Sequence, residues 1–216
     1  MKTKAFLLMT ILFLAGGLVF SQEIKPGITA GVNFQNLNGK NIYGDKLENK
    51  LIIGFHAGVN ILIPIAPMIN FQPGLLFSTA GATNQNDSPG IKYKLNYLDL
   101  PLDIVYRGSL GDNFVLLGFG PYLGFAINGN VNVGGEDRKI VFRNTVETGD
   151  PLTTPYLKRF DAGANIFAGY ELGGGLYFTL DTQLGLIKLN PKDNRLGDDK
   201  SIVKNTGFGL SVGYRF

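Results

Sequence analysis

The sequence predicts an all-β fold, an eight-stranded antiparallel up-and-down transmembrane β-barrel. Two observations predict it. Eight segments alternate large apolar residues with small or polar ones, and the connections between them alternate in length between short and long. Because successive side chains of a strand point to opposite sides, each segment would carry one apolar face and one small or polar face. A barrel in a membrane turns the apolar face to lipid and the other face to its lumen.

The N-terminus has the features of a secretory signal peptide. Lys2 and Lys4 precede an apolar run over residues 5–20, and Ser21 is a small residue before a plausible cleavage point. The run falls short of the roughly 20 residues that a membrane-spanning helix needs. We therefore expect residues 1–21 to be a signal peptide and residues 22–216 to form the barrel domain.

Composition argues against several classes of function. The 216 residues include 30 Gly and no Cys, and 17% are charged, against about 25% in an average protein. Residues 1–21 contain two lysines and no acid, so the 20 basic residues fall to 18 against 17 acidic ones, a net charge of +1. We therefore expect no nucleic-acid partner, no disulfide framework and no thiolate metal site. No later apolar run is long enough for a spanning helix, so strands would have to cross the membrane.

The eight segments pair into four hairpins along the chain. Each has about the length that a tilted membrane-crossing strand needs, roughly 9–11 residues. The last one ends on the aromatic residues Tyr214 and Phe216, which resemble the C-terminal signal of bacterial outer-membrane barrels. The segments are residues 27–35, 53–63, 69–78, 92–106, 115–127, 160–172, 176–186 and 205–216.

The connections indicate the topology. Residues 65–67, 107–113 and 171–175 would be tight turns, whereas residues 36–50, 80–90, 128–157 and 188–204 are longer and polar. Short periplasmic turns, long extracellular loops and an even strand count are typical of outer-membrane barrels. We therefore expect the chain in the cell outer membrane with both termini in the periplasm. Its expected partners are outer-membrane lipid and the barrel-assembly machinery during insertion.

Three motifs carry a family resemblance. YLDLPL at residues 97–102, GFGPYLG at residues 118–124 and GYRF at residues 213–216 resemble the PorT-like family of outer-membrane β-barrel proteins. The resemblance covers nearly all of residues 22–216 and implies an eight-stranded barrel in the outer membrane of a Gram-negative bacterium. The family is broad, and most of its members have no assigned activity. Its name comes from a component linked to protein secretion, so a place in a secretion assembly is an alternative role.

Charged and polar residues fall on the predicted lumen face. An eight-stranded barrel leaves an interior just wide enough to be filled by side chains or to hold one small ligand. A salt-bridged plug is therefore favoured over an ion path. Unpaired buried charges are costly, so Arg215 is expected to pair with an acid from a neighbouring strand. The residues of this predicted network are His56, Asp99, Asp103, Asp161, Asp181, Arg215 and Lys94.

Two features resemble ligand-binding or catalytic motifs. The GFG sequences at residues 118–120 and 207–209 lack both the spacing and the strand-to-helix context of a nucleotide-binding loop, so lumen-facing glycine is the better interpretation. His56 is the single histidine, which makes a zinc site unusual. Ser78 or Ser211 could partner it in a hydrolase, but no local motif supports that. We expect no catalytic residue, no cofactor and no metal.

The long connection at residues 128–157 bears on function. It contains the charged run EDRK at residues 136–139 and the apolar run at residues 140–142, which could extend a strand or form a partner-binding surface. The favoured function is structural, adhesive or scaffold-like, through four extracellular loops and with an extracellular or periplasmic protein partner.

Three alternative functions stay open. They are a narrow channel or small-ligand transporter, a hydrolase built on His56, and a soluble lipocalin-type barrel. The last requires reversed faces, and the Gly- and Asn-rich faces of this chain do not suit an apolar pocket.

Overall fold

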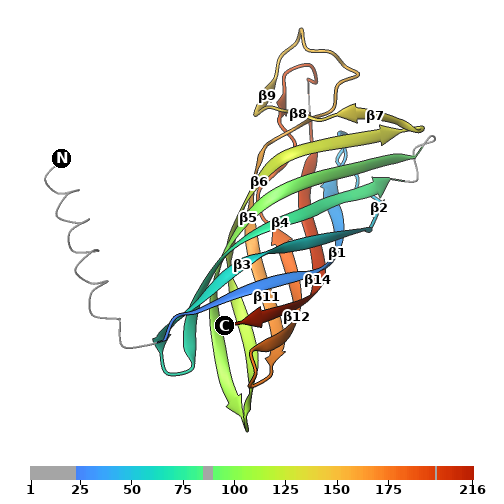
Figure 1. Ribbon diagram of the computed structural model, residues 1–216. Helices are drawn as coiled ribbons and strands as arrows, with labels where there is room; N and C mark the ends of the chain where they lie inside the picture. The colour runs from blue at the N-terminus through green and yellow to red at the C-terminus, as the bar shows by residue number, and fades with distance from the viewer. Residues whose placement is uncertain (1–22, 85–89, 198) are drawn as a thin grey trace, which may run out of the picture.

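The computed structural model describes residues 23–84, 90–197 and 199–216. Eight long antiparallel strands form a closed ring (Figure 1), because each pairs with the next and the last pairs with the first. The strands are β1 (Lys25–Lys40), β3 (Ile52–Ala66), β4 (Ile69–Asn84), β5 (Ile91–Leu110), β6 (Asn113–Val133), β11 (Phe160–Glu171), β12 (Leu176–Gly185) and β14 (Ile202–Arg215). The predicted eight-stranded up-and-down barrel is confirmed. The predicted signal peptide, residues 1–21, lies outside the described residues.

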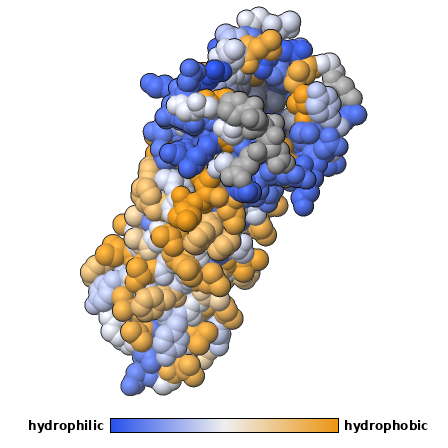
Figure 2. Space-filling model, turned by 90° about the vertical axis from the view of Figure 1, so that its right-hand side faces the viewer, coloured by the Kyte–Doolittle hydropathy of each residue, from blue (hydrophilic) through white to orange (hydrophobic). Residues whose placement is uncertain are grey.

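The two faces of the strands separate as the alternation predicts. Large apolar side chains of all eight strands are exposed on the outer wall, among them Ile53 and Phe55 on β3 and Leu210 and Val212 on β14. On the face that Figure 2 shows, apolar residues cover the lower part of the molecule, and hydrophilic residues gather at the end that carries the long loops. The described part of the chain contains no helix with the length and apolar character that a membrane crossing requires.

Three tight turns close one end of the barrel, which we call the turn end. The β5–β6 turn is Gly111–Asp112, where Gly111 has a φ of 63°. A turn does lie within the predicted residues 107–113, but it is shorter than predicted because β5 continues to Leu110. The prediction over residues 65–67 is also displaced, because β3 continues to Ala66 through a bulge at Pro64. Proline is tolerated at a bulge, where no ladder hydrogen bond is required.

The strands extend further at the opposite end, which we call the loop end. β6 continues to Val133 and turns through Gly134 and Gly135, both at positive φ, into β7 (Glu136–Lys139). Short strands also pair at the loop end. After β7, β8 (Val141–Phe142) pairs with β10 (Tyr156–Leu157), and β9 (Thr145–Val146) pairs with β13 (Lys192–Asp193). Earlier in the chain, β2 (Asn49–Lys50) pairs with β4. Residues 128–157 are therefore a folded segment and not one long loop.

The interior has three layers. An apolar cluster fills the loop end, and we call it the apolar plug. A smaller apolar group lies near the turn end, formed by Leu62, Val105, Leu116 and Tyr177. Between them lies a polar layer that contains His56 and the lumen aspartates. The plug consists of Leu37, Ala80, Ala82, Leu95, Tyr97, Ala126, Val131, Ile140, Leu157 and Leu189.

The apolar plug corrects the expectation of a polar lumen along the whole barrel. Leu37, Ala80 and Ala82 lie on extensions of β1 and β4 beyond the predicted segments. Ile140, Leu157 and Leu189 come from the connections that the sequence analysis described as polar loops. Burying these side chains against each other removes apolar surface from water, which stabilises the loop end.

Candidate functional site: the barrel lumen

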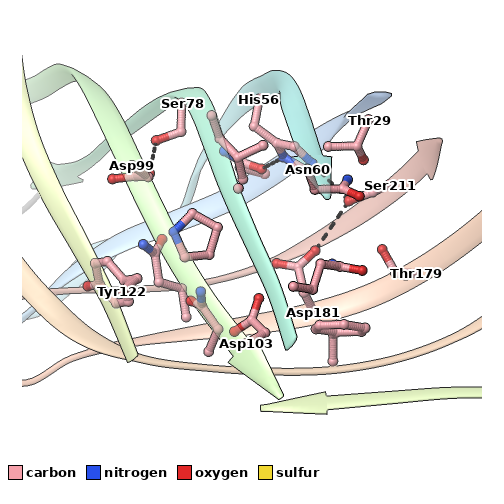
Figure 3. Close-up of a pocket in the computed structure, with 18 of the residues that line it drawn as sticks. Thr29, His56, Asn60, Ser78, Asp99, Asp103, Tyr122, Thr179, Asp181 and Ser211 are labelled. Carbon is pink, nitrogen blue, oxygen red and sulfur yellow. Dashed lines mark hydrogen bonds between the residues drawn. The ribbon is translucent and has the colours of Figure 1, made fainter. Parts of the chain in front are cut away.

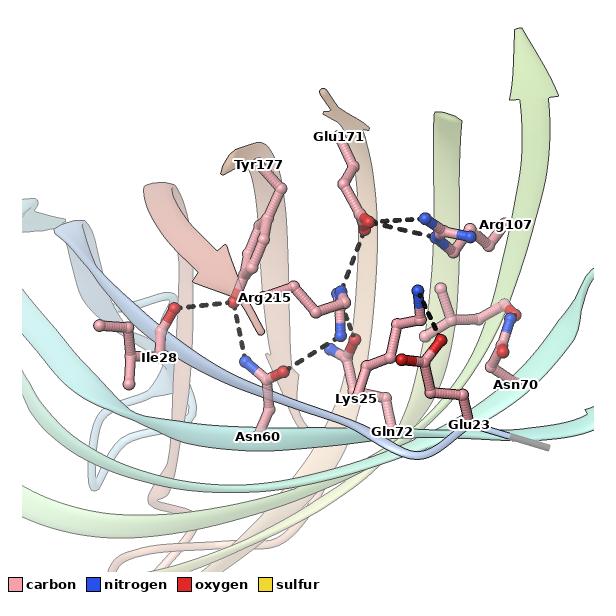
Figure 4. Close-up of polar contacts among 11 residues, drawn as sticks. Glu23, Lys25, Ile28, Asn60, Asn70, Gln72, Arg107, Glu171, Tyr177 and Arg215 are labelled. Carbon is pink, nitrogen blue, oxygen red and sulfur yellow. Dashed lines mark hydrogen bonds and ion pairs between the residues drawn. The ribbon is translucent and has the colours of Figure 1, made fainter. Parts of the chain in front are cut away.

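An ion-pair network spans the lumen at the turn end (Figure 4). Arg215 Nε donates to Glu171 Oε2 at 3.0 Å, and Arg107 Nη2 donates to Glu171 Oε1 at 2.7 Å. Two further donors of Arg215 reach Asn60 Oδ1 at 3.4 Å and Gln72 Oε1 at 3.2 Å. Because charge-assisted hydrogen bonds are stronger than neutral ones, this network ties together β3, β4, β5, β11 and β14.

Tyr177 completes the network. Its hydroxyl accepts from Asn60 Nδ2 at 2.8 Å and donates to the carbonyl oxygen of Ile28 at 3.1 Å. The Arg215 guanidinium lies 4.9 Å from the centre of the Tyr177 ring, within reach of a cation–π contact. Gly213 provides space for this ring, since a Cβ there would lie 2.2 Å from it.

Of the charged residues in this ion-pair network, only Arg215 was predicted from the sequence. Arg215 pairs with an acid, but Glu171 lies on β11, one strand beyond its neighbour β12. Glu171 and Arg107 were missed because the sequence analysis assigned both to turns. The period of two residues could have identified both. Arg107 is an even number of positions from Asp99 and Asp103, so it faces the lumen as they do. Glu171 has the same relation to Asp161.

The polar layer contains a chain of contacts centred on His56 (Figure 3). His56 Nδ1 contacts Asn33 Oδ1, and His56 Nε2 lies 2.8 Å from Ser211 Oγ. Ser211 Oγ in turn donates to Asp181 Oδ1 at 3.4 Å. A Cβ at Gly31, which lies between His56 and β14, would meet the histidine ring at 2.6 Å, so glycine leaves the space that these contacts need.

Asn33, His56 and Ser211 have the connectivity of a hydrolase triad, with an orienting group, a base and a hydroxyl. Acyl transfer also needs hydrogen-bond donors where negative charge develops beside the nucleophile. Ser211 instead faces the carboxylate of Asp181, which would oppose that charge. The other candidate serine, Ser78, donates to Asp99 Oδ2 at 2.5 Å. The arrangement therefore does not favour a hydrolase.

The lumen aspartates are held by neutral groups. Tyr122 donates to Asp161 Oδ2 at 3.1 Å and Asn205 Nδ2 does so at 3.4 Å. Within the described residues, no Lys or Arg forms an ion pair with Asp99, Asp103, Asp161 or Asp181. The sequence predicted that ion pairs fill the lumen. Among the described lumen residues, such ion pairs are formed at the turn end, by Glu171 with Arg107 and Arg215.

Lys94 does not belong to the lumen. Its side chain is exposed on the outside of β5, because residue 94 shares a face with Leu98 and Leu100 and not with Asp99. The prediction that placed it with the lumen acids is wrong. Within the described residues, no three of His, Cys, Asp and Glu are grouped closely enough to hold a metal ion.

The glycines of the two GFG sequences face lumen side chains. A Cβ at Gly118 would lie 2.2 Å from the Phe167 ring, and one at Gly120 would lie 2.8 Å from Asp103 Oδ1. A Cβ at Gly209 would lie 2.8 Å from both carboxylate oxygens of Asp181. These glycines give the larger side chains of neighbouring strands room inside a narrow barrel.

A closed ring of eight antiparallel strands, an apolar outer wall and a polar inner layer define a small outer-membrane β-barrel. The chain belongs to the outer membrane protein beta-barrel domain family, whose sequence profile matches residues 20–190. A search of curated proteins finds no match to the chain.

Three solved structures are similar. OprG from Pseudomonas aeruginosa has a TM-score of 0.52 and 11% identity, over 89% of this chain and 95% of OprG. Neisserial surface protein A has a TM-score of 0.48 and 12% identity, over 90% and 100%. Ail, the attachment invasion locus protein of Yersinia pestis, has a TM-score of 0.40 and 15% identity, over 90% and 100%. The likeness to OprG supports the fold alone.

Proposed function

We propose that this outer-membrane barrel has a structural, adhesive or scaffold-like role, without catalytic activity, and acts through its folded loop end. The observation that carries the proposal is that residues 134–159 and 187–197 fold onto each other. We call these two segments the loop cap. The partner we propose is a protein or surface outside the cell that contacts the cap.

Backbone pairing and burial support a defined cap surface. β9 pairs with β13 across the two segments, and Lys158 N donates to the Leu189 carbonyl at 2.6 Å. Val146 and Leu189 are fully buried. A pre-ordered surface loses less conformational entropy on binding than mobile loops do.

Charged side chains of the cap are also fixed. Arg143 makes two hydrogen bonds to Asp150, at 2.9 Å and 3.0 Å. Arg195 contacts Asp193 Oδ2 at 2.6 Å and the Pro151 carbonyl at 2.8 Å. Hydrogen bonds from Arg195 lower the pKa of the Asp193 carboxyl, so this pair stays charged at neutral pH. The hydrogen bond from Arg195 to the Pro151 carbonyl joins the two cap segments, and the other two pairs fix charged side chains within each segment.

We propose that the cap is extracellular, that both termini are periplasmic and that residues 1–21 are a cleaved signal peptide. The short turns and long loop-end connections support this orientation. We also propose that the chain is a PorT-like member of its broader family, on the motifs at residues 97–102, 118–124 and 213–216. The apolar plug argues against the alternative of a channel, because an ion passing through it would lose its hydration.

Site-specific crosslinking tests the proposed role. A photoreactive residue at Leu152, which is 81% exposed on the cap, should crosslink to one defined partner on intact cells. The same group at Leu184, on the outer wall of β12, is the control and should crosslink to lipid only. Equal labelling patterns at both positions would contradict a cap-mediated role. Planar-bilayer conductance that disappears in Asp103→Asn would overturn the proposal in favour of a channel.

A further inference from the structure

The polar layer encloses a cavity of about 120 Å³ between the apolar plug and the turn-end network. Four carboxylates surround or adjoin it. Asp99, Asp103 and Asp181 line it (Figure 3), and Asp161 is buried above them, across Gly124 from Asp99. Among the described residues that line it, Arg215 is the one arginine, and Glu171 already engages it; His56 is the other basic side chain of the lining.

The carboxylates of this layer lack the donors that would balance them. Asp103 is 4% exposed and Asp161 is 1% exposed, and the Oδ1 atom of each has no hydrogen-bond partner. Within the described residues, every buried side-chain atom without a partner is an oxygen. These atoms are Gln35 Oε1, Tyr97 OH, Asp103 Oδ1, Asp161 Oδ1 and Asn205 Oδ1. The lumen therefore has an excess of hydrogen-bond acceptors and of acidic side chains.

Two of these carboxylates line the cavity from different strands. Asp103 extends from β5 and Asp181 from β12, and both side chains line the same cavity. Gly120 and Gly209 lie beside them and leave the space that each carboxylate occupies. Bringing like charges together in a region removed from bulk water is costly unless a positive charge compensates them.

We propose that this cavity binds a small organic ammonium ion between Asp103 and Asp181. Such an ion brings positive charge together with several N–H donors. Among the residues that line the cavity, Asp103 Oδ1 and Gln35 Oε1 are buried oxygens without a hydrogen-bond partner in the described part of the chain. A single metal ion fits less well, because no three acidic or histidine side chains among the described residues are grouped closely enough to hold one. The proposal is independent of the role of the loop cap.

Calorimetry on the protein purified from outer membranes in detergent tests this site. The probe is 1,4-diaminobutane, which carries an ammonium group at each end, and the matched control is 1,4-butanediol, which has the same carbon chain without charge. Ionic strength is held constant with NaCl. We expect saturable binding of the diamine and none of the diol. No saturable diamine binding, or equal binding of both compounds, would overturn the proposal.

Variants locate the site. Asp103→Asn and Asp181→Asn should each weaken diamine binding at least tenfold. Asp137→Asn removes an exposed acid of β7 and should leave it unchanged. Unchanged affinity in both lumen variants would show that the amine binds elsewhere and would overturn the site. If either variant fails to fold, thermal unfolding of the unmodified protein tests binding instead. The diamine should raise the unfolding midpoint and the diol should not, and an equal midpoint with both compounds would overturn the proposal.

Discussion

Arg215 and Glu171 form a buried ion pair, with Nε and Oε2 3.0 Å apart, from two strands that are not neighbours in the ring. The pair passes across the lumen face of β12 and joins the C-terminal strand β14 to the end of β11. Glu171 also accepts from Arg107, so one carboxylate balances two guanidinium groups. Because the network links side chains from β3, β4, β5, β11 and β14 across the lumen, it stabilises the closed ring.

Replacing Arg215 with Ala should destabilise the folded barrel. The change removes the donors to Glu171, Asn60 and Gln72, but Glu171 keeps Arg107. We expect a loss of about 1–3 kcal/mol, the cost of leaving buried polar groups unpaired. The midpoint of the heat-dependent gel shift measures it. Arg138→Ala, which removes an exposed pair with Glu136, is the control and should change nothing. An unchanged midpoint in Arg215→Ala would contradict the assigned pairing.

Replacing Glu171 with Gln should cost more than replacing Arg215 with Ala. Without the carboxylate, Arg107 and Arg215 are two like charges at one end of the lumen with no counter-charge from Glu171. Breaking a buried pair by removing one partner typically costs about 3–5 kcal/mol. The same gel assay ranks the variants. The double variant Glu171→Gln with Arg107→Gln should recover part of the loss, and a midpoint lower than in either single variant would count against this account.

Adding a methyl group at Gly120 should impair barrel folding. A Cβ there would lie 2.2 Å from the backbone oxygen of Leu102 and 2.6 Å from the Asp103 Cα, and a backbone cannot move aside as a side chain can. We expect Gly120→Ala to lower the folded fraction after refolding into detergent. Gly149→Ala is the matched control, because a Cβ at Gly149 meets no atom within 4 Å. Equal folded fractions would refute the close approach of β5 and β6.

Truncating Leu189 should loosen the loop cap without opening the barrel wall. Leu189 is fully buried in the apolar plug and comes from the connection between β12 and β14. Leu→Ala in a packed core typically costs about 2–5 kcal/mol. Limited proteolysis should cut the cap of Leu189→Ala faster, while the gel shift persists. Leu196→Ala, at a side chain that is 38% exposed, should behave like the unmodified protein. Unchanged cleavage would mean that the plug does not hold the cap.

Acid should weaken the cap through Asp193. Hydrogen bonds from Arg195 lower the pKa of Asp193 below its usual 3.8, so the folded state favours the ionised carboxyl. A depressed pKa contributes stability that is present above the unfolded value and is lost as the pH falls through the folded value. We expect the rate of pepsin cleavage of the cap to rise as the pH falls below about 4. In Asp193→Asn the cleavage should be faster at the upper pH and less dependent on pH. The same pH profile in both proteins would exclude Asp193 as a cause.

The sequence by itself determined the eight strands, their two faces and their order. These follow from a period of two residues, which is a local property: residues that alternate along β14 or β3 separate to opposite faces wherever the strand lies. The same alternation placed His56, Asp99, Asp103, Asp161, Asp181 and Arg215 inside. The alternation did not locate the ends of the strands. Arg107 and Glu171 were therefore predicted to lie in turns, and Leu37, Ala80 and Ala82 were predicted to lie in loops.

Only the tertiary structure decided which lumen groups meet. Glu171 reaches Arg215 across β12, Asn33 and Ser211 reach His56 from β1 and β14, and Leu189 enters the barrel from a distant connection. These contacts depend on the stagger between neighbouring strands and on ring closure between β1 and β14. Strand tilt and stagger are properties of the whole ring, so the contacts across its lumen are set when the barrel closes and not by any single strand.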